Sequence, residues 1–325
     1  MKATSVAPSN IAFIKYWGRK NEELRLPENG SISMNLSGLQ TTTTVEFNEK
    51  FNQDEITITG VKEDLKNNRA VKHLGRIRSM AKIDLKAKVV TKNNFPTGTG
   101  LSSSASGFAA LTVASSKAAG LKLSEKDLSI LARQGSGSAC RSIPDGIVEW
   151  LDGNTSDTSY AVSIFPPDYF DIADVTAVVS TEKKFLPTSE GQKTAKTSPF
   201  FEKRLQGING EIREIKNAIK EKDFTKFGEI VEKEALEFHS ILFTSSPPLF
   251  YWTPQTVLVM KQVQALRRDG LESYFTINTG QDIHVICQKN DAEKVSKKLS
   301  ALSEVNNVIV NYPARGAYLT DKHLF

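Results

Sequence analysis

The sequence predicts an α+β fold with two lobes, and two observations carry this prediction. Strand-like segments rich in β-branched residues alternate with loop-like segments in the first third of the chain, whereas long, charged, amphipathic helical segments dominate after about residue 180. This change places a domain boundary near residue 172, so we expect lobes formed by residues 1–172 and 173–325. The cleft between two lobes is the default position for a small-molecule site.

The first lobe is predicted to combine strands with three helices. Residues 41–47 and 55–59 resemble paired strands, because Thr, Val and Ile are frequent in them. Val71, Leu74 and Ile77 recur at helical spacing. The expected helices are 68–80, 103–119 and 124–134, the last with Ser124 and Asp127 at its start, and further strands are expected at 85–91, 147–150 and 160–164.

The second lobe is predicted to be richer in helix. Long amphipathic segments with many charged residues fill much of it, and no internal repeat or low-complexity tract stands out. The expected helices are 198–220, 222–243, 254–269 and 290–302, and the expected strands are 175–179, 272–278, 282–287 and 306–310.

The composition is that of an ordinary globular protein and argues against several classes. Of 325 residues, 39% are apolar and 24% are charged, and no apolar run reaches the length of about 18 residues that a membrane span needs. The formal charge of +5 is spread along the chain near acidic residues, which argues against nucleic-acid binding. Cys140 and Cys287 are far apart, the four histidines are scattered and no apolar leader follows Met1, so we expect a cytoplasmic protein without structural zinc.

The most informative stretch is Asn93–Gly107, which reads NNFPTGTGLSSSASG. Gly98 and Gly100 let the backbone approach a bulky anion closely, and Ser102–Ser104 open an apolar helical run. A glycine-rich loop that leads into a helix N-terminus is typical of phosphate binding. It is not a P-loop, because no Gly-Lys-Ser/Thr follows. The alternative is an ordinary serine-rich helix cap after a loop.

Three other clusters can carry chemistry. Lys15 ends an apolar strand and precedes two aromatic residues, so it can place a charge in a partly dry pocket, although a lysine that reaches solvent from a strand end gives the same pattern. In the Gly-rich turn at 135–142, two serines and Arg141 suit a carboxylate or a phosphate, and a surface loop is the alternative. At 275–282 a strand bends back through a glycine turn, which a plain hairpin also explains.

In order and spacing, these clusters resemble the mevalonate diphosphate decarboxylase branch of the galactokinase–homoserine kinase–mevalonate kinase–phosphomevalonate kinase superfamily. The Lys-Tyr-Trp-Gly and Gly-Ser-Gly-Ser-Ala-Cys-Arg-Ser strings resemble the decarboxylases more than the kinases at large. The resemblance implies a ribosomal-protein-S5-like N-terminal lobe with the ATP loop, an α/β C-terminal lobe that completes the substrate site, an active site in the cleft, and a homodimer. The resembling segments cover nearly the full length and are 10–18, 29–33, 93–107, 135–142, 238–239 and 247–251.

The resemblance also implies a reaction and the residues that perform it. These enzymes use ATP and Mg²⁺ to phosphorylate the tertiary 3-hydroxyl of a mevalonate 5-phosphate species, and the new phosphate then leaves together with CO₂. The implied catalytic residues are Lys15 beside the 3-oxygen, Ser104 at the phosphate and Mg²⁺, Arg141 at the carboxylate, and Asn278 at the family's aspartate position. The implied ATP-binding residues are Asn93, Pro96, Thr97, Gly98, Thr99, Gly100, Ser102, Ser103 and Ser104. The implied substrate-binding residues are Tyr16, Trp17, Arg69, Ser136, Ser138 and Arg141.

The chain departs from the family pattern at the hairpin bend. The family has an aspartate followed by Ala-Gly-Pro-Asn, where this chain has Asn278-Thr279-Gly280-Gln281-Asp282. In the family the aspartate orients or deprotonates the 3-hydroxyl, and a neutral amide cannot accept that proton. Three explanations are open: an engineered Asp→Asn variant that traps substrate, a natural relative that has lost the kinase step, or a relative in which Asp282 serves instead.

The altered bend favours mevalonate 5-phosphate as the substrate. The expected function is therefore an ATP-dependent decarboxylase that produces isopentenyl phosphate in isoprenoid biosynthesis. Arg69 argues for the alternative substrate, mevalonate 5-diphosphate, which would give isopentenyl diphosphate. Two further alternatives are a mevalonate 3-kinase that stops before decarboxylation and a catalytically dead relative that only binds ligands. Lys15 and Arg141 speak against the kinase, and Asn278 alone supports the dead relative.

Overall fold

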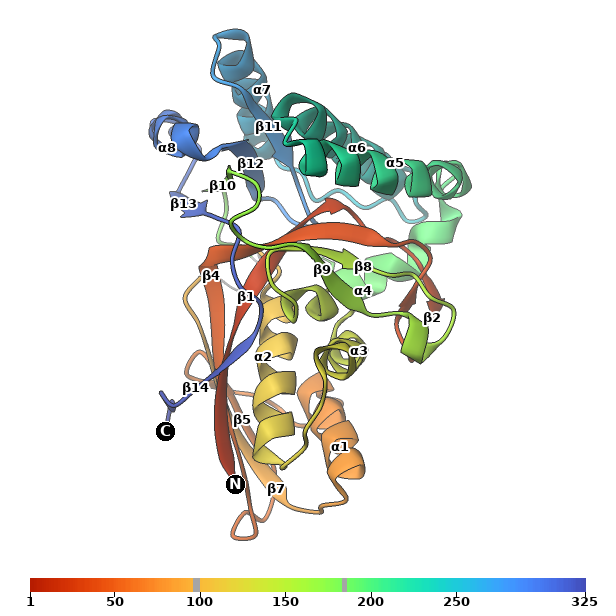
Figure 1. The fold of residues 1–325 in the computed structure, drawn as a ribbon, viewed down its shortest axis with the longest axis vertical. Coiled ribbons are helices and arrows are strands. Elements are labelled where there is room, and N and C mark those ends of the chain that lie inside the picture. The colour runs from red at the N-terminus through yellow and green to blue at the C-terminus, as the bar shows by residue number, and fades with distance from the viewer. Residues whose placement is uncertain (96–99, 183–185) are drawn as a thin grey trace.

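The computed structural model describes residues 1–95, 100–182 and 186–325, and it has two lobes, one above the other in Figure 1. The predicted α+β fold is confirmed, because strands build two main sheets and helices pack on them. Within the described part of the chain, no helix is both long enough and apolar enough to cross a bilayer.

The larger sheet has eight strands and forms most of the lower lobe in Figure 1. Its longest strands, β1 (Lys2–Ile14) and β4 (Ser31–Asn48), pair antiparallel along nearly their whole length. The others are β5 (Glu55–Ile58), β6 (Val61–Lys62), β7 (Lys86–Asn93), β8 (Ile147–Trp150), β9 (Ala161–Phe165) and β14 (Tyr318–Thr320). The order is β14-β1-β4-β7-β5-β6, and β8 joins β4 to β9. A separate hairpin contains β2 (Arg19–Asn21) and β3 (Leu26–Pro27).

Three helices stand beside this sheet. Helix α2 (Ser103–Ala118) packs on β1 and β4, and α1 (Arg69–Ala81) and α3 (Glu125–Gly135) flank α2 (Figure 1). The predicted start of α3 is confirmed, since Ser124 and Asp127 form a reciprocal capping box there. The buried contacts between helices and sheet are apolar, as the period of about 3.6 residues requires, and they include Leu74, Ile77, Leu111, Val45, Phe47 and Val89.

The upper lobe is built on a four-stranded sheet in the order β11-β12-β10-β13. Helices α7 and α8 pack on this sheet through a core that includes Val259, Val263, Val295 and Leu299. The strands are β10 (Ile172–Val178), β11 (Ser273–Thr276), β12 (Ile283–Gln288) and β13 (Asn307–Asn311). The helices are α4 (Thr188–Gly191), α5 (Phe201–Glu221), α6 (Phe224–Thr244), α7 (Pro254–Arg268) and α8 (Ala292–Ser300), with a 3₁₀ segment at Gln192–Thr197 after α4.

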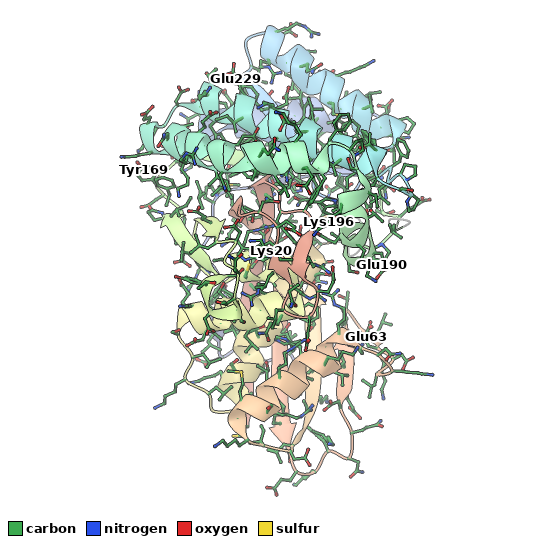
Figure 2. All side chains as sticks on the ribbon, turned by 90° about the vertical axis from the view of Figure 1, so that its right-hand side faces the viewer. Lys20, Glu63, Tyr169, Glu190, Lys196 and Glu229 are labelled. Carbon is green, nitrogen blue, oxygen red and sulfur yellow. The ribbon has the colours of Figure 1, made fainter. Side chains whose placement is uncertain are left out.

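A continuous core joins the two lobes. Phe13, near the end of β1, meets Phe227 of α6 edge to face with 4.9 Å between ring centroids. At the waist of the molecule, Lys196 forms an ion pair with Glu28 of the lower lobe at 2.6 Å (Figure 2). The first contact holds the end of β1 against α6, and the second ties the segment after β3 to the upper lobe.

The domain boundary near residue 172 stays a prediction, but the structure corrects the assignment of the last residues. Strand β10 begins at Ile172, in keeping with the predicted start of a second lobe. However, β14 returns to the edge of the larger sheet, where Thr320 pairs with Thr4. The C-terminal segment therefore rejoins the first lobe, so no single cut in the chain separates the two sheets.

Candidate active site

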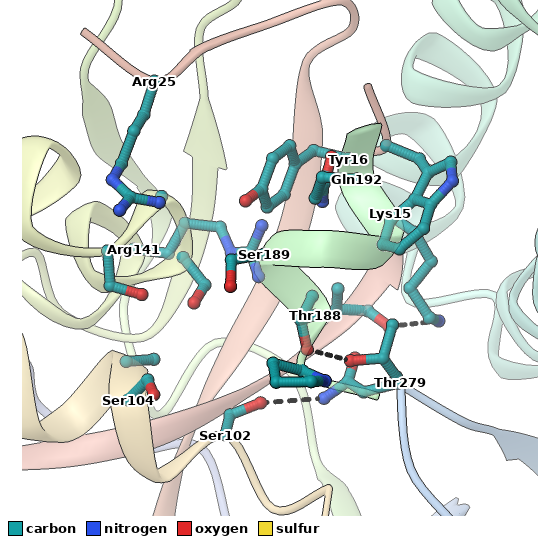
Figure 3. Close-up of a pocket in the computed structure, with 18 of the residues that line it drawn as sticks. Lys15, Tyr16, Arg25, Ser102, Ser104, Arg141, Thr188, Ser189, Gln192 and Thr279 are labelled. Carbon is teal, nitrogen blue, oxygen red and sulfur yellow. Dashed lines mark hydrogen bonds between the residues drawn. The ribbon is translucent and has the colours of Figure 1, made fainter. Parts of the chain in front are cut away.

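A pocket lies where the end of β1, the start of α2, the 3₁₀ helix η1 (Gly137–Ser142) and the bend after β11 converge (Figure 3). It brings together the four sequence clusters. The predicted site residues that line it are Lys15, Tyr16, Trp17, Arg69, Gly100, Ser102, Ser103, Ser104, Ser136, Ser138, Arg141 and Asn278.

The other predicted site residues do not line the pocket in the described structure. Asn93 is not among the lining residues, and its Oδ1 accepts a hydrogen bond from Thr41 Oγ1 at 2.6 Å, which joins two neighbouring strands. Pro96, Thr97, Gly98 and Thr99 lie outside the described residues.

The serine loop enters α2 through backbone conformations that its residues make possible. Gly100 has φ of +126°, and a Cβ there would lie 2.7 Å from the Cα of Gly280, so the loop and the bend are in contact. Ser102 is left-handed with φ of 56°, and α2 begins at the next residue. Because Ser102, Ser103 and Ser104 line the pocket, the N-terminus of a 16-residue helix lies at its wall, which is an arrangement that binds anions.

Lys15 follows β1 and is only 3% exposed. Its Nζ donates to the backbone carbonyl of Ala12 at 2.7 Å and to Thr276 Oγ1 at 2.5 Å, and it lies 3.5 Å from Glu234 Oε2. Burial lowers the pKa of Lys15 to about 8; Glu234 opposes this shift, while Arg204 and Arg141 add to it. A proton at Nζ is therefore far more labile than on an exposed lysine.

Glu234 and Arg204 form the buried support beneath Lys15. Glu234, on α6, is fully buried, and its Oε1 accepts from the Lys15 backbone N–H at 2.9 Å and from Arg204 Nη2. Arg204, on α5, also donates to the Lys15 carbonyl at 2.8 Å and is 7% exposed. Two basic side chains thus share one carboxylate in a largely buried place.

Arg141 is held at the pocket wall by neutral groups. Its Nη1 donates to Ser31 Oγ at 2.8 Å and its Nη2 to Asn10 Oδ1 at 3.0 Å, while its Nε has no partner in the described structure. Asn10 is fixed in turn, because its Nδ2 donates to Ser142 Oγ at 2.8 Å. A guanidinium that is 4% exposed and not paired with any described carboxylate is prepared to bind an anionic ligand.

Beyond Tyr16 the pocket wall carries three further guanidinium groups, those of Arg19, Arg25 and Arg69. Arg25 donates to the Gln134 carbonyl at 3.2 Å and Arg69 to the Gly135 carbonyl at 2.8 Å, so backbone oxygens position both. Of the three, only Arg19 forms an ion pair within the described residues, with Glu22. Burial, with repulsion from Arg25, lowers the pKa of Arg69 to about 10. This end of the pocket has a surplus of positive charge, which an anion with several charges would relieve.

The bend places Asn278 in the pocket but not Asp282. Asn278 Nδ2 donates to Ser102 Oγ at 3.1 Å, which ties the bend to the serine loop. Asp282 is 3% exposed, is absent from the lining residues, and accepts from the Val179 backbone N–H through Oδ1 at 3.0 Å. The geometry therefore gives no support to Asp282 as a replacement for the family's aspartate.

Several pocket residues were not identified from the sequence. Arg19 and Arg25 lie in the β2–β3 hairpin, which carried no recognised motif. The segment around α4 also lines the pocket, through Pro187, Thr188, Ser189 and Gln192, and Gln192 Oε1 accepts from the Gly18 backbone N–H at 2.7 Å. Arg19 could have been identified, since it directly follows the Lys-Tyr-Trp-Gly motif. No sequence motif indicated Arg25 or the residues around α4.

Comparisons with known proteins agree with this arrangement. Residues 7–161 match the family of diphosphomevalonate decarboxylase-like N-terminal domains, and residues 175–317 match the mevalonate 5-diphosphate decarboxylase C-terminal domain. The chain is 36% identical to diphosphomevalonate decarboxylase from Candida albicans over 311 residues, which cover 90% of this chain and 86% of that protein. It is 38% identical to the Danio rerio enzyme of the same name over 266 residues, or 76% and 66% of the two chains.

Solved structures of mevalonate diphosphate decarboxylases have the same fold as this chain. Mevalonate diphosphate decarboxylase from Staphylococcus aureus superposes with a TM-score of 0.93 at 36% identity and covers 98% of each chain. The Enterococcus faecalis enzyme, described with a mevalonate diphosphate-mediated ATP binding mechanism, gives 0.90 at 36% identity over 99% of each chain. A further structure, described as a complex with MVAPP, AMPPCP and magnesium, gives 0.92. The expected two-lobed superfamily fold is confirmed.

Proposed function

This chain belongs to the diphosphomevalonate decarboxylase family, and we propose that it uses ATP to decarboxylate mevalonate 5-diphosphate to isopentenyl diphosphate. The sequence-based preference for the 5-monophosphate is replaced here by its alternative. The similarity to known proteins favours this change, because the relatives named above are diphosphomevalonate decarboxylases.

The observation that carries the proposal is the arginine-rich end of the pocket. Arg19, Arg25 and Arg69 together provide three guanidinium groups with one paired carboxylate among the described residues. A diphosphate offers more negative charge and more acceptor oxygens than a monophosphate, and guanidinium groups bind such oxygens bidentately. Arg141, whose guanidinium donates to the neutral side chains of Ser31 and Asn10, would hold the substrate carboxylate.

The same pocket suits ATP and Mg²⁺. The N-terminus of α2 and the hydroxyls of Ser102–Ser104 would position the phosphates. Magnesium prefers oxygen ligands and usually keeps substrate phosphates and water in its shell, so hydroxyls fit it even though the described lining contains no carboxylate. Bound there through ATP, with Ser104 as the proposed protein contact, Mg²⁺ would neutralise charge on the transferred phosphoryl group.

The chemistry divides between Lys15 and Arg141. Near Lys15, the tertiary hydroxyl would attack the γ-phosphorus, a step that depends on position and charge neutralisation. When the new phosphate leaves, positive charge develops at the tertiary carbon, and CO₂ is lost from the neighbouring carboxylate. Arg141 would keep that carboxylate oriented until it leaves.

A substrate panel tests the proposal. Initial rates are measured with Mg-ATP and, separately, mevalonate 5-diphosphate, mevalonate 5-phosphate and mevalonate. We expect the highest kcat/KM with the diphosphate. A higher kcat/KM with the monophosphate would return the assignment to that substrate. The predicted homodimer is tested separately by light scattering of the same preparation.

A further inference from the structure

The described lining of the pocket lacks the carboxylate that would accept the proton of the substrate's hydroxyl. Phosphorylation of an alcohol requires that the hydroxyl proton go to an acceptor. None of the described residues that line the pocket is Asp, Glu or His, and Asn278 presents an amide. Serine hydroxyls and guanidinium groups are not proton acceptors near neutral pH. Lys15 and Tyr16 are the lining residues left to consider.

Tyr16 lies on the wrong side for this task. Its hydroxyl lies over Gly137, where an added Cβ would come within 2.5 Å of it, and its ring packs on Trp150 with 4.6 Å between centroids. This places the phenol on η1 and near the arginine-rich end, away from the contact between Asn278 and Ser102. Lys15, by contrast, contacts Thr276, two residues before Asn278.

The buried charges around Lys15 balance when its side chain is neutral. Arg204 is permanently charged, and its guanidinium is hydrogen-bonded to Glu234 Oε1. With this pair neutral overall, a proton on Lys15 would leave one excess positive charge in a site that is 3% exposed. Taking such a charge out of water is costly unless a second carboxylate is present. An aspartate at position 278 would supply one, and asparagine does not.

We propose that Lys15, as a neutral amine, is the general base that accepts the proton of the substrate's tertiary hydroxyl, and that Arg204 maintains the amine by engaging Glu234. This inference rests on the proposed function. It makes the chain an active enzyme in spite of Asn278, through a base that the polypeptide already places in the pocket.

The step balances without a further reactant. The hydroxyl oxygen forms a bond to the γ-phosphorus of ATP, and its proton passes to the lone pair of Lys15 Nζ. The bond between the γ-phosphorus and the β–γ bridging oxygen breaks, and its electron pair leaves with ADP. Lys15 is then an ammonium beside the new phosphate ester, where it stabilises the phosphate as it departs with CO₂.

The groups that face Lys15 act in opposite directions, and on balance they favour the amine. Glu234 from α6 favours the ammonium, whereas burial, Arg204 from α5 and Arg141 from η1 favour the amine, and burial is the largest effect. His239 from α6 does not add a charge at neutral pH, because burial lowers its pKa to about 3. The amine is the base at high pH and is lost as the pH falls through about 8, so activity should rise over that range.

Replacement of Lys15 is the first test. kcat/KM for ADP formation is measured from pH 6 to pH 10 with the parent protein, Lys15→Arg and Lys15→Ala. Lys20→Arg is the matched control, because Lys20 is exposed, labelled in Figure 2, and donates to the Asp152 carbonyl outside the pocket. We expect an ascending limb near pH 8 in the parent and control. Lys15→Arg keeps a positive charge but should lose activity by about 100-fold or more, in keeping with the loss of a general base.

Chemical rescue separates a base from a fixed cation. Methylamine or ethylamine is added to Lys15→Ala at a constant total concentration while the pH is varied. If Lys15 is a base, the restored rate follows the concentration of free amine and rises with pH. If the site needs only a cation, the restored rate follows the ammonium form and falls with pH, which would overturn the proposal.

Substitutions of Glu234 and Arg204, the two neighbours of Lys15, should move the ascending limb of the pH profile of kcat/KM in opposite directions. Glu234→Gln removes the negative neighbour, so the ammonium is less stable and the limb should move to lower pH. Arg204→Met removes the positive neighbour, so the limb should move to higher pH. Thermal melting verifies that each variant is folded. A purely structural role for the two residues would lower stability without these opposed shifts.

The outcomes distinguish failure of the inference from failure of the proposed function. Turnover by Lys15→Arg at close to the parental rate, with an unchanged pH profile, overturns Lys15 as the base and leaves the decarboxylase assignment intact. If the parent binds Mg-ATP and the diphosphate but shows no turnover at any pH, both are overturned.

Discussion

The amide of Asn278 links two parts of the site through a single hydrogen bond. It donates to Ser102 Oγ at 3.1 Å, so the bend after β11 and the serine loop before α2 are joined at this point. A carboxylate in the same place would accept a hydrogen bond from that hydroxyl, because serine can donate as well as accept. Substitution of this one residue therefore changes the proton chemistry without requiring a new fold.

Asn278→Asp is expected to raise turnover at pH 6 by about tenfold or more, because a carboxylate remains an available base far below the pKa of Lys15. At pH 9, where the lysine is an amine, the difference should be small. Initial rates of ADP release at the two pH values check this. In the Asn278→Asp background, Lys15→Arg should also cost much less than in the parent; an equal loss in both backgrounds contradicts a shared role as base.

Arg69→Met tests the arginine-rich end of the pocket. Loss of a charge-assisted hydrogen bond, about 1.5–3 kcal/mol, should raise KM for mevalonate 5-diphosphate by about tenfold or more with little change in kcat. Arg76→Met is the control, since Arg76 lies on the same helix but outside the lining residues. Steady-state kinetics distinguish the two. Equal KM values for Arg69→Met and the parent would remove Arg69 from the substrate site.

At the scale of elements, the serine loop depends on close backbone contact with the bend. Gly100→Ala would place a methyl group 2.7 Å from Gly280 Cα on a backbone with φ of +126°. We expect a strain of about 1–3 kcal/mol and weaker binding of an ATP analogue. Gly107→Ala, within α2 and with no atom beyond its neighbours and its own helix backbone within 4 Å of the added Cβ, should be neutral or slightly stabilising. Calorimetry and thermal melting measure both effects; equal binding by the two variants would contradict the proposed loop contact.

Helices were predictable because their patterns are local, whereas several strands were not. The segments predicted at 198–220, 222–243 and 254–269 correspond to α5, α6 and α7 within a few residues. Strand β4 runs from Ser31, ten residues before the predicted start, because pairing with β1 and β8 compensates for Ser, Asn and Gly residues of low strand propensity. Strand β14 has only three residues, which is too short for a sequence pattern that predicts a strand.

The site was predictable where its residues form a string. The serine loop, Lys15 and Arg141 stand in motifs, and the structure gathers them in one pocket. Glu234 and Arg204 lie on helices whose charged residues resemble an ordinary solvated face, and Glu234 is 219 positions from Lys15. Only packing between distant segments buries these two residues beside Lys15, so the local sequence pattern could not identify them as site residues.

At the scale of the whole molecule, the last residues fasten the N-terminal strand. Strand β14 pairs with β1, and the Leu324 backbone N–H donates to Thr44 Oγ1 at 2.9 Å. Removal of residues 317–325 would leave an unpaired edge on β1. We expect a lower melting temperature and concentration-dependent aggregation, measured by calorimetry and light scattering. An unchanged melting temperature would show that this pairing contributes little to stability.

The most direct test of the central claim is the amount of ADP and CO₂ released from one reaction mixture with Mg-ATP and mevalonate 5-diphosphate. Lys15 and Arg141 both line the pocket, and their proposed roles at the reacting oxygen and at the carboxylate predict equal amounts of the two products. Release of ADP without CO₂ would show that the chain stops at phosphorylation. Release of neither product between pH 6 and pH 10 would contradict the account as a whole.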